Sequence, residues 1–453
     1  MAERMLVVWS AWPKGACEVR SAELASRDRR VLWHPFTQQL GWEHERFPVI
    51  ERAEGTTLYD VDGRAYIDGV SSLWCNVHGH RHPAIDAAVR AQLDRVAHST
   101  MLGLSHGPAI ELAERLVELA PPGLSRVFYS DSGATAVEVA LKIAFQYWAQ
   151  REGAPRRRTF IRLRDAYHGD TIGSVSVGGI ELFGATYRPL LFDTLQAEPG
   201  DERELARLLQ AHGDEVAAVV IEPLVQGAAG MLLHPPGYLR AVRELCSEHG
   251  VLLICDEVAT GFGRTGTMFA CEQEDVSPDL LCLAKGLTGG YLPLAATLAS
   301  ERIYEAFLAR HEEFRTFFHG HTYTGNPLAC AAALAALDVF ERERTLNRLR
   351  GKIALLERLL AELVAPLPAV AEIRQRGFMV GIALGGFQAA DRMGHQVTVA
   401  AREGGAIIRP LGDVVVLMPP LSIAEGELRR LVEITGSAIE QATETGTGLA
   451  RAA

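Results

Sequence analysis

Two short apolar runs, each followed by a charged residue, stand out in the middle of the chain. Residues 251–255 are all apolar and precede Asp256, and residues 280–284 are apolar and precede Lys285. Short apolar runs bounded by polar residues and glycine are typical of fully buried strands in a parallel sheet. In open α/β sheets, ligands bind beyond the carboxyl ends of the strands. We therefore expect one carboxylate and one amine at a ligand-binding edge.

Further strands and helices are predicted around these two runs. Apolar residues 127–129 lead through a glycine-containing turn into an apolar helix. A second strand opens residues 158–179, and a third, within residues 215–231, ends at Glu222. Residues 236–250 follow as an amphipathic helix closed by glycine. Strand, helix and strand in this order imply a right-handed crossover in a parallel sheet.

The two ends of the chain have a different character. Residues 56–74 alternate apolar and polar positions around Asp62-Gly63, a strong hairpin signal. Residues 338–445 combine charged amphipathic helix with strand signals, as in a smaller α+β domain. The 453 residues also exceed one typical core. The predicted division is a tail or disordered segment 1–25, an N-terminal arm 26–75 that joins the small domain, a large domain 76–335 and a C-terminal small domain 336–445.

Composition and charge exclude several classes of protein. Apolar residues make up 48% of the chain and charged residues 22%, as in ordinary globular enzymes. The net charge of −11 argues against a nucleic-acid partner. No apolar run reaches the roughly 18 residues of a membrane span, and the N-terminal apolar stretch lacks a signal-peptide cleavage motif. Seven cysteines without a CxxC pair predict neither a disulfide framework nor a zinc site. The expected compartment is the cytoplasm.

The strand-end lysine and aspartate suit one cofactor in particular. Pyridoxal phosphate binds a lysine amine through its aldehyde and needs a carboxylate beside its ring nitrogen. Each residue alone is more often a solvated surface charge. The surrounding sequence DEVATGFGRTG, followed by LAKGL, resembles the signature of the class III pyridoxal-phosphate aminotransferases. The resemblance extends from about residue 30 to 440. It implies the type I fold of pyridoxal-phosphate transferases: a large α/β domain with a mixed, mostly parallel sheet, a smaller α+β domain, and a homodimer.

The resemblance implies roles for several strand-end residues. Lys285 would bind the cofactor and transfer the proton, and Asp256 would keep the ring nitrogen protonated. Tyr167 would stack on the ring, with Glu222 in a supporting role near its phenolic oxygen.

The phosphate is expected at the turn before the apolar helix that starts near residue 134. A strand, a glycine-containing turn and a helix N-terminus form an anion site. The family places the phosphate on Gly133 and its neighbour, which is Ala134 here and offers a backbone N–H but no hydroxyl. Thr322 would reach the partner subunit's phosphate across the dimer interface, and Gly320 in the same loop would contact substrate.

Three other stretches resemble one branch of the family. The sequences HPFTQ, SSLWCNVHGH and IIRPLGDVVVLMPP match the branch that converts 8-amino-7-oxononanoate to 7,8-diaminononanoate in biotin biosynthesis. Phe36 and Trp74 would form the apolar walls for the substrate, and Arg409 would bind its carboxylate. The usual amino donor of this branch is S-adenosylmethionine. Phe36 and Leu73 replace residues typical of the enzymes that use that donor. The stretches HPFTQ, SSLWCNVHGH and DSGA look more like the lysine-using branch, so L-lysine is a second possible donor.

Several alternatives stay open. The chain could be a class III transaminase of ω-amino acids or diamines, an aminomutase such as glutamate-1-semialdehyde aminomutase, or a pyridoxal-phosphate-binding regulator. Against the regulator, only about 30 residues precede the arm, too few for a DNA-binding domain. Three histidines, 78, 80 and 82, alternate along one segment, but no neighbouring carboxylate or cysteine completes a metal site, so no metal is expected.

Overall fold

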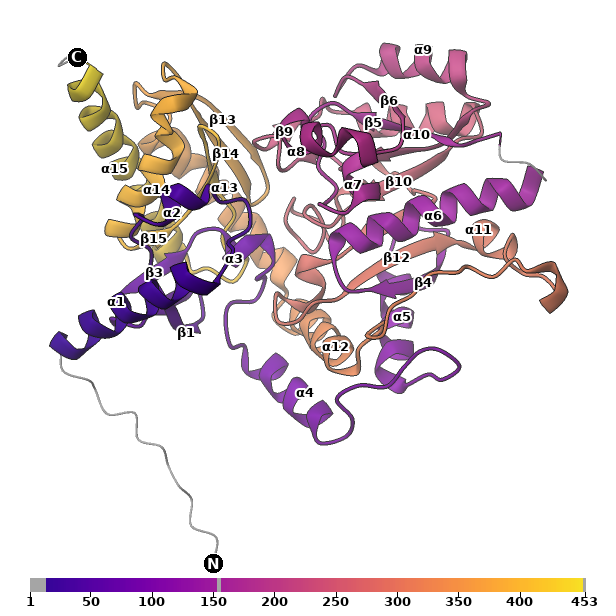
Figure 1. Cartoon of the computed structure of the whole chain (residues 1–453), viewed down its shortest axis with the longest axis horizontal. Coiled ribbons are helices and arrows are strands. Elements are labelled where there is room, and N and C mark those ends of the chain that lie inside the picture. The colour runs from indigo at the N-terminus through magenta and orange to yellow at the C-terminus, as the bar shows by residue number, and fades with distance from the viewer. Residues whose placement is uncertain (1–13, 153–155, 451–453) are drawn as a thin grey trace, which may run out of the picture.

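The computed structural model describes residues 14–152 and 156–450, and its largest element is a seven-stranded sheet (Figure 1). Six strands run in one direction, and β12 is antiparallel to both of its neighbours, β11 and β4. The predicted mixed, mostly parallel sheet is therefore confirmed. In order across the sheet the strands are β4 (Leu124–Ser130), β12 (Ala295–Ser300), β11 (Leu280–Leu283), β10 (Leu252–Asp256), β7 (Val216–Ile221), β5 (Thr159–Leu163) and β6 (Thr194–Ala197).

Both faces of this sheet are covered, which explains the unbroken apolar runs. Leu252 and Ile254 of β10 belong to the apolar cluster that contains helix α6 (Gly133–Glu152). Leu253 and Cys255 point to the opposite face and belong to the cluster that contains the crossover helix α10 (Tyr238–Glu248). Successive side chains of a strand alternate between faces, so a strand buried on both sides requires apolar residues at every position. Helix α10 connects the adjacent parallel strands β7 and β10, as predicted.

A helical layer lies beside β4. Helix α12 (Pro327–Arg342) packs against α4 (Pro83–Leu93) and α5 (Gly107–Leu119). Its alanine-rich sequence allows this close approach. The remaining short elements of this part are α7 (Ile172–Ser176), α8 (Glu181–Gly184), α11 (Glu301–Glu305), β8 (Val225–Gln226) and β9 (Leu232–Leu233), with 3₁₀ turns at Ala185–Leu190, Ala270–Glu274, Lys285–Thr288 and His311–Glu313; a further 3₁₀ turn, Ala389–Asp391, lies in the C-terminal part.

The C-terminal part is built on a second, antiparallel sheet, on the left in Figure 1. Its strand order is β13-β14-β17-β16. The helices α14 and α15 pack on each other, and α13 packs on α15. The bounds are α13 (Thr345–Leu363), β13 (Val370–Arg376), β14 (Met379–Leu384), α14 (Met393–Glu403), β15 (Ala406–Ile407), β16 (Arg409–Leu411), β17 (Val414–Leu417) and α15 (Glu425–Ala450).

The N-terminal arm shares a sheet with this C-terminal part. The predicted hairpin around Asp62-Gly63 is confirmed: β2 (Thr57–Asp60) pairs antiparallel with β3 (Ala65–Asp68). Strand β1 (Ile50–Glu54) extends the hairpin, and β15 pairs in parallel with β3. Two short helices, α2 (Gln39–Trp42) and α3 (Ser71–Trp74), flank the hairpin.

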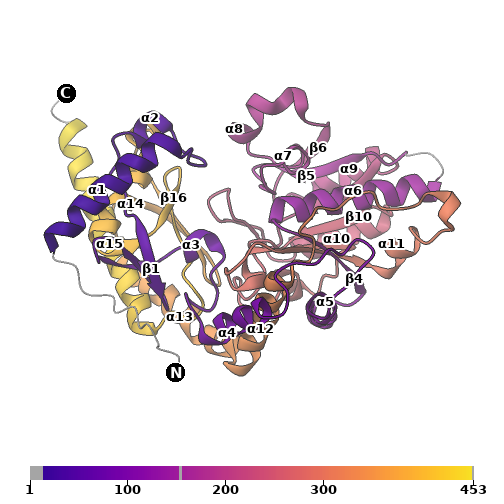
Figure 2. The ribbon, with the colours of Figure 1, turned by 60° about the horizontal axis from the view of Figure 1, so that its bottom comes forward.

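The expectation of a tail or disorder for residues 1–25 is wrong where the structure describes them. Helix α1 spans Lys14–Val31 and lies on the same side as α14 and α15 (Figures 1 and 2). Polar contacts hold it: Arg20 pairs with Glu51 at 2.7 Å, and Asp28 accepts a hydrogen bond from the Trp42 indole at 2.9 Å. The helix has no apolar stripe, so hydrophobic periodicity gave no signal. Residues 1–13 lie outside the described part.

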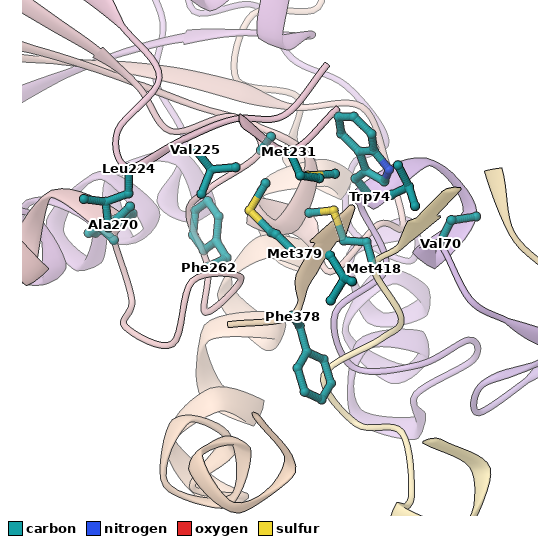
Figure 3. Close-up of a cluster of buried hydrophobic side chains, with 14 of the residues drawn as sticks. Val70, Trp74, Leu224, Val225, Met231, Phe262, Ala270, Phe378, Met379 and Met418 are labelled. Atoms are coloured by element: carbon teal, nitrogen blue, oxygen red, sulfur yellow. The ribbon is translucent and has the colours of Figure 1, made fainter. Parts of the chain in front are cut away.

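One apolar cluster joins the large sheet to the C-terminal part. Val70 and Trp74 lie in it together with Met231, Met379 and Met418 (Figure 3). Within residues 14–152 and 156–450, no helix is both long and apolar enough to cross a membrane.

Candidate active site

The carboxyl ends of the central strands open into a cavity of about 800 Å³. Asp256 ends β10, Lys285 follows β11, and Glu222 follows β7. Their common edge is a consequence of parallel strand order, because neighbouring parallel strands end on the same side. Residues lining the cavity include Leu73, Trp74, Gly133, Ala134, Tyr167, His168, Glu222, Asp256 and Lys285.

Lys285 begins a 3₁₀ turn with a left-handed backbone conformation, φ 46°. Its amine lies 4.9 Å from the centroid of the Trp74 ring. Burial lowers the pKa of Lys285, and the carboxylates of Asp256 and Glu222 oppose this effect. The lowered pKa increases the fraction of neutral amine near neutrality, and the neutral amine is the nucleophilic form.

Asp256 is held by two hydrogen bonds. Its Oδ2 lies 2.7 Å from Nδ1 of His168, and its Oδ1 accepts from the backbone N–H of Val258 at 3.0 Å. Burial lowers the pKa of His168, but the hydrogen bond and charge of Asp256 outweigh burial and raise it overall. His168 therefore orients the carboxylate, and its Nε2 has no hydrogen-bond partner among the described residues. The sequence interpretation gave His168 no role, although its position directly after Tyr167 was a possible signal.

Glu222 is buried in the wall of the cavity. Burial is the main cause that raises the pKa of its carboxyl to about 7. Its two oxygens accept hydrogen bonds from the backbone N–H groups of Tyr167 at 3.1 Å and Gly227 at 2.9 Å. These bonds fix Tyr167, whose hydroxyl donates to Asp170 at 2.8 Å.

The N-terminus of α6 forms a narrow backbone surface at one end of the cavity. A Cβ atom added to Gly133 would lie 2.5 Å from a methyl carbon of Val258. Gly169 has φ +121°, and a Cβ atom there would lie 2.4 Å from the Cβ of Ala134. Only glycine fits both positions, and the free N–H groups of a 20-residue helix point to this end. An amine, a carboxylate and a helix N-terminus around one cavity fit the aldehyde, ring nitrogen and phosphate of pyridoxal phosphate.

Phe36 and Arg409 line a second cavity of about 550 Å³. The ring of Phe183 lies between these two sites, packing edge-on against Phe36 at 5.3 Å and against Tyr167, which lines the first cavity, at 5.9 Å. Burial lowers the pKa of Arg409, and the electrostatic interaction with Tyr167 partly opposes this effect. The Arg409 guanidinium has no hydrogen-bond acceptor within the described chain. Ser72 lines this second cavity, whereas the following residues 73–74 line the first.

The structure places two predicted residues outside both cavities. Thr322 and Gly320 are exposed, and no atom would meet a Cβ added to Gly320 within 4 Å. The three histidines of the 78–82 segment separate: His80 bonds to Asp68, and His82 bonds to Glu343, each at 2.9 Å. The buried His78 packs edge-on against Phe340.

Comparison with known proteins decides the family. The family Aminotransferase class-III matches residues 41–439. This chain belongs to the class III aminotransferases. An adenosylmethionine-8-amino-7-oxononanoate aminotransferase of Nitratidesulfovibrio vulgaris is 58% identical to this class III aminotransferase, covering 94% of the chain and 83% of the relative. An enzyme of the same name from Geobacter sulfurreducens is 49% identical, covering 93% and 97%.

Solved structures agree with this assignment. The crystal structure of adenosylmethionine-8-amino-7-oxononanoate aminotransferase from Methanocaldococcus jannaschii has a TM-score of 0.91 at 44% identity, covering 93% of this chain and 99% of that one. An amine transaminase from an uncultivated Pseudomonas species, described as PLP-bound, has a TM-score of 0.85 at 35% identity, covering 91% and 99%. The predicted family, the type I fold and the pyridoxal-phosphate cofactor are thus confirmed. The protein is a pyridoxal-phosphate-dependent aminotransferase.

Proposed function

We propose that this aminotransferase transfers an amino group to 8-amino-7-oxononanoate, giving 7,8-diaminononanoate in biotin biosynthesis. The observation that carries the proposal is the second cavity, which contains the guanidinium of Arg409 without a protein partner, close enough to interact with Tyr167 of the Lys285 cavity. An acceptor with a carboxylate at the far end of an apolar chain fits that arrangement. The names of relatives 58%, 49% and 49% identical to this chain support the same substrate.

Each side chain in the first cavity would have a defined task. When bound, pyridoxal phosphate supplies an electron-accepting ring that carries the amino group from donor to acceptor. Lys285 would capture its aldehyde and, once released, move a proton at its amine nitrogen. Asp256, oriented by His168, would keep the ring nitrogen protonated. Gly133 and Ala134 would bind the phosphate through backbone N–H groups, and Tyr167 would cover the ring, with Glu222 fixing its backbone.

The identity of the amino donor can be determined by measuring turnover with each candidate. The relatives' names support S-adenosylmethionine, whereas Phe36 and Leu73 favour L-lysine. Purified holoenzyme should be incubated with the acceptor and each donor separately, and 7,8-diaminononanoate measured by mass spectrometry. We expect product with S-adenosylmethionine. Product with L-lysine alone would assign that donor instead, and no product with either would contradict the proposed function.

Replacing Arg409 with alanine separates this function from that of an ω-amino acid or diamine transaminase, whose acceptors need not carry a distant carboxylate. We expect Arg409→Ala to raise the KM for 8-amino-7-oxononanoate about tenfold to a hundredfold, the loss typical of one charged hydrogen bond. Arg402→Ala is a matched control, because Arg402 lines the same cavity but already pairs with Glu45 at 3.1 Å. Equal KM values for both variants would favour the rival function.

We further propose that the chain acts as a homodimer in the cytoplasm. Thr322 would cross the interface to the partner subunit's phosphate site, and Gly320 would approach substrate there. Their exposure on the single chain supports this, as do nearby exposed apolar side chains that a second subunit would cover. These are Leu102, Leu104, Phe314, Phe318 and Tyr323.

A further inference from the structure

The segment that carries Trp74 has an unusual backbone. Ser71, Ser72 and Trp74 have φ angles of 52°, 59° and 63°, in the left-handed region that favours glycine. Non-glycine residues keep such angles only where the surrounding structure holds them in place, and such sites are often functional. The Trp74 indole is buried and lines the Lys285 cavity, and its Nε1 has no hydrogen-bond partner among the described residues. The contacts that hold this segment therefore determine the shape of the cavity wall.

Asp68 holds the start of the segment. Its side chain is fully buried, and both of its oxygens accept from the backbone N–H of Ser72 at 2.9 Å. Oδ1 also faces the N–H of Val70 at 3.4 Å. Oδ2 also accepts a hydrogen bond, at 2.9 Å, from Nε2 of His80. A buried carboxylate without such donors would be costly, so His80 completes the site that fixes Ser72.

The hydrogen-bond network assigns the proton on His80. The backbone N–H of Gly79 donates to Oδ1 of Asn76 at 2.8 Å, which turns the Asn76 amide nitrogen toward His80. That nitrogen lies 3.2 Å from Nδ1 of His80 and can only donate. Nδ1 is therefore the acceptor, and Nε2 carries the hydrogen that it donates to Asp68. His80 thus links both ends of the strained segment, from Asp68 to Asn76.

The far side of the segment is attached to other parts of the protein. The buried guanidinium of Arg264 donates to the carbonyl of Asn76 at 2.7 Å and to that of Pro419 at 2.6 Å. The Ser71 hydroxyl donates to the carbonyl of Met418 at 2.7 Å. Because the segment is anchored on that side, the Asp68–His80 pair determines how far the Trp74 side chain can still move.

We propose that Asp68 and His80 are positioning residues for substrate binding, acting by holding Trp74 as a rigid wall beside Lys285. This inference rests on the proposed function, with Trp74 as the apolar wall for the acceptor that the sequence predicts. His80 does not line the cavity itself, so its effect passes through the strained segment.

The test is a double-mutant cycle on the holoenzyme. His80→Leu removes the donor to Asp68, and we expect it to raise the acceptor KM about tenfold, as small displacements of binding groups do, with less change in kcat. His80→Gln keeps a donor that can reach Asp68 and should restore most of the affinity. His82→Leu is the matched control, because it removes the hydrogen bond of a neighbouring histidine, the one to Glu343, without touching Asp68. In a Trp74→Ala background, His80→Leu should add less than about a twofold effect.

The outcomes separate the inference from the proposed function. Independent, multiplying effects at positions 74 and 80 would overturn the inference, as would a His80→Leu enzyme with wild-type KM values. An effect of His82→Leu on KM equal to that of His80→Leu would also overturn it. If the wild-type enzyme does not use 8-amino-7-oxononanoate, the proposed function fails. In that case the same double-mutant cycle is measured with the KM for the amino donor. Independent effects at positions 74 and 80 on that KM would again overturn the inference.

Discussion

Replacing Lys285 with alanine is expected to lower kcat by about 10⁴-fold or more, because the variant lacks both the amine that binds the cofactor and the proton-transferring group. The position of Lys285 supports this magnitude: it is partly buried, lies just beyond the end of β11 and lines the same cavity as Asp256. The measurements are product formation under saturating substrates and the absorbance of the holoenzyme, which should lose the band of the lysine-bound cofactor.

Lys352→Ala provides a matched control for this variant. Lys352 is also a partly buried lysine whose pKa is lowered by burial, and its amine donates to the carbonyl of Leu421 at 2.9 Å. It does not line the Lys285 cavity. We expect its loss to reduce thermal stability while kcat stays near the wild-type value. Substantial turnover by Lys285→Ala would contradict the assignment of the cofactor site.

Asp256→Asn is expected to lower kcat about 10³-fold, the scale on which a preorganised electrostatic group acts. The neutral amide keeps the size of the side chain and can still accept from His168. It lacks the negative charge that would keep the cofactor ring nitrogen protonated. Steady-state kcat with both substrates saturating is the measurement, together with the amount of bound cofactor, which should change much less.

Asp279→Asn separates chemistry from stability in the same sheet. Asp279 is a buried carboxylate that pairs with Arg243 at 2.8 Å and Arg302 at 2.6 Å, and it accepts from the backbone N–H of Leu253. Its loss should lower the melting temperature more than that of Asp256→Asn but leave kcat within about threefold of wild type, because it makes no contact with reacting groups. Comparable losses of kcat in both variants would indicate that Asp256 acts only through stability.

Much of the architecture around the site was predictable from local pattern. The apolar runs before Asp256 and Lys285 predicted buried strands, because strands buried on both faces tolerate few polar residues. The hairpin at Asp62-Gly63 could be predicted because its turn requires a residue such as glycine. The class III signature then connected these local features to a cofactor, and the family comparison agrees. Each of these signals resides in neighbouring residues of one short stretch.

Contacts between distant segments were decided only by the tertiary structure. His168 meets Asp256 across 88 positions, and Phe183 links Phe36 to Tyr167. The raised pKa of Glu222 depends on its burial, which no local pattern reports. Helix α1 was missed because polar contacts, not an apolar stripe, hold it.

By itself, therefore, the sequence determined the family, the strands and the chemical groups that follow them, because these depend on residue type and local spacing. Which groups touch, how their charges shift each other and how the segment at 71–74 is held depend on packing between elements far apart in the chain, and only the folded structure decided them.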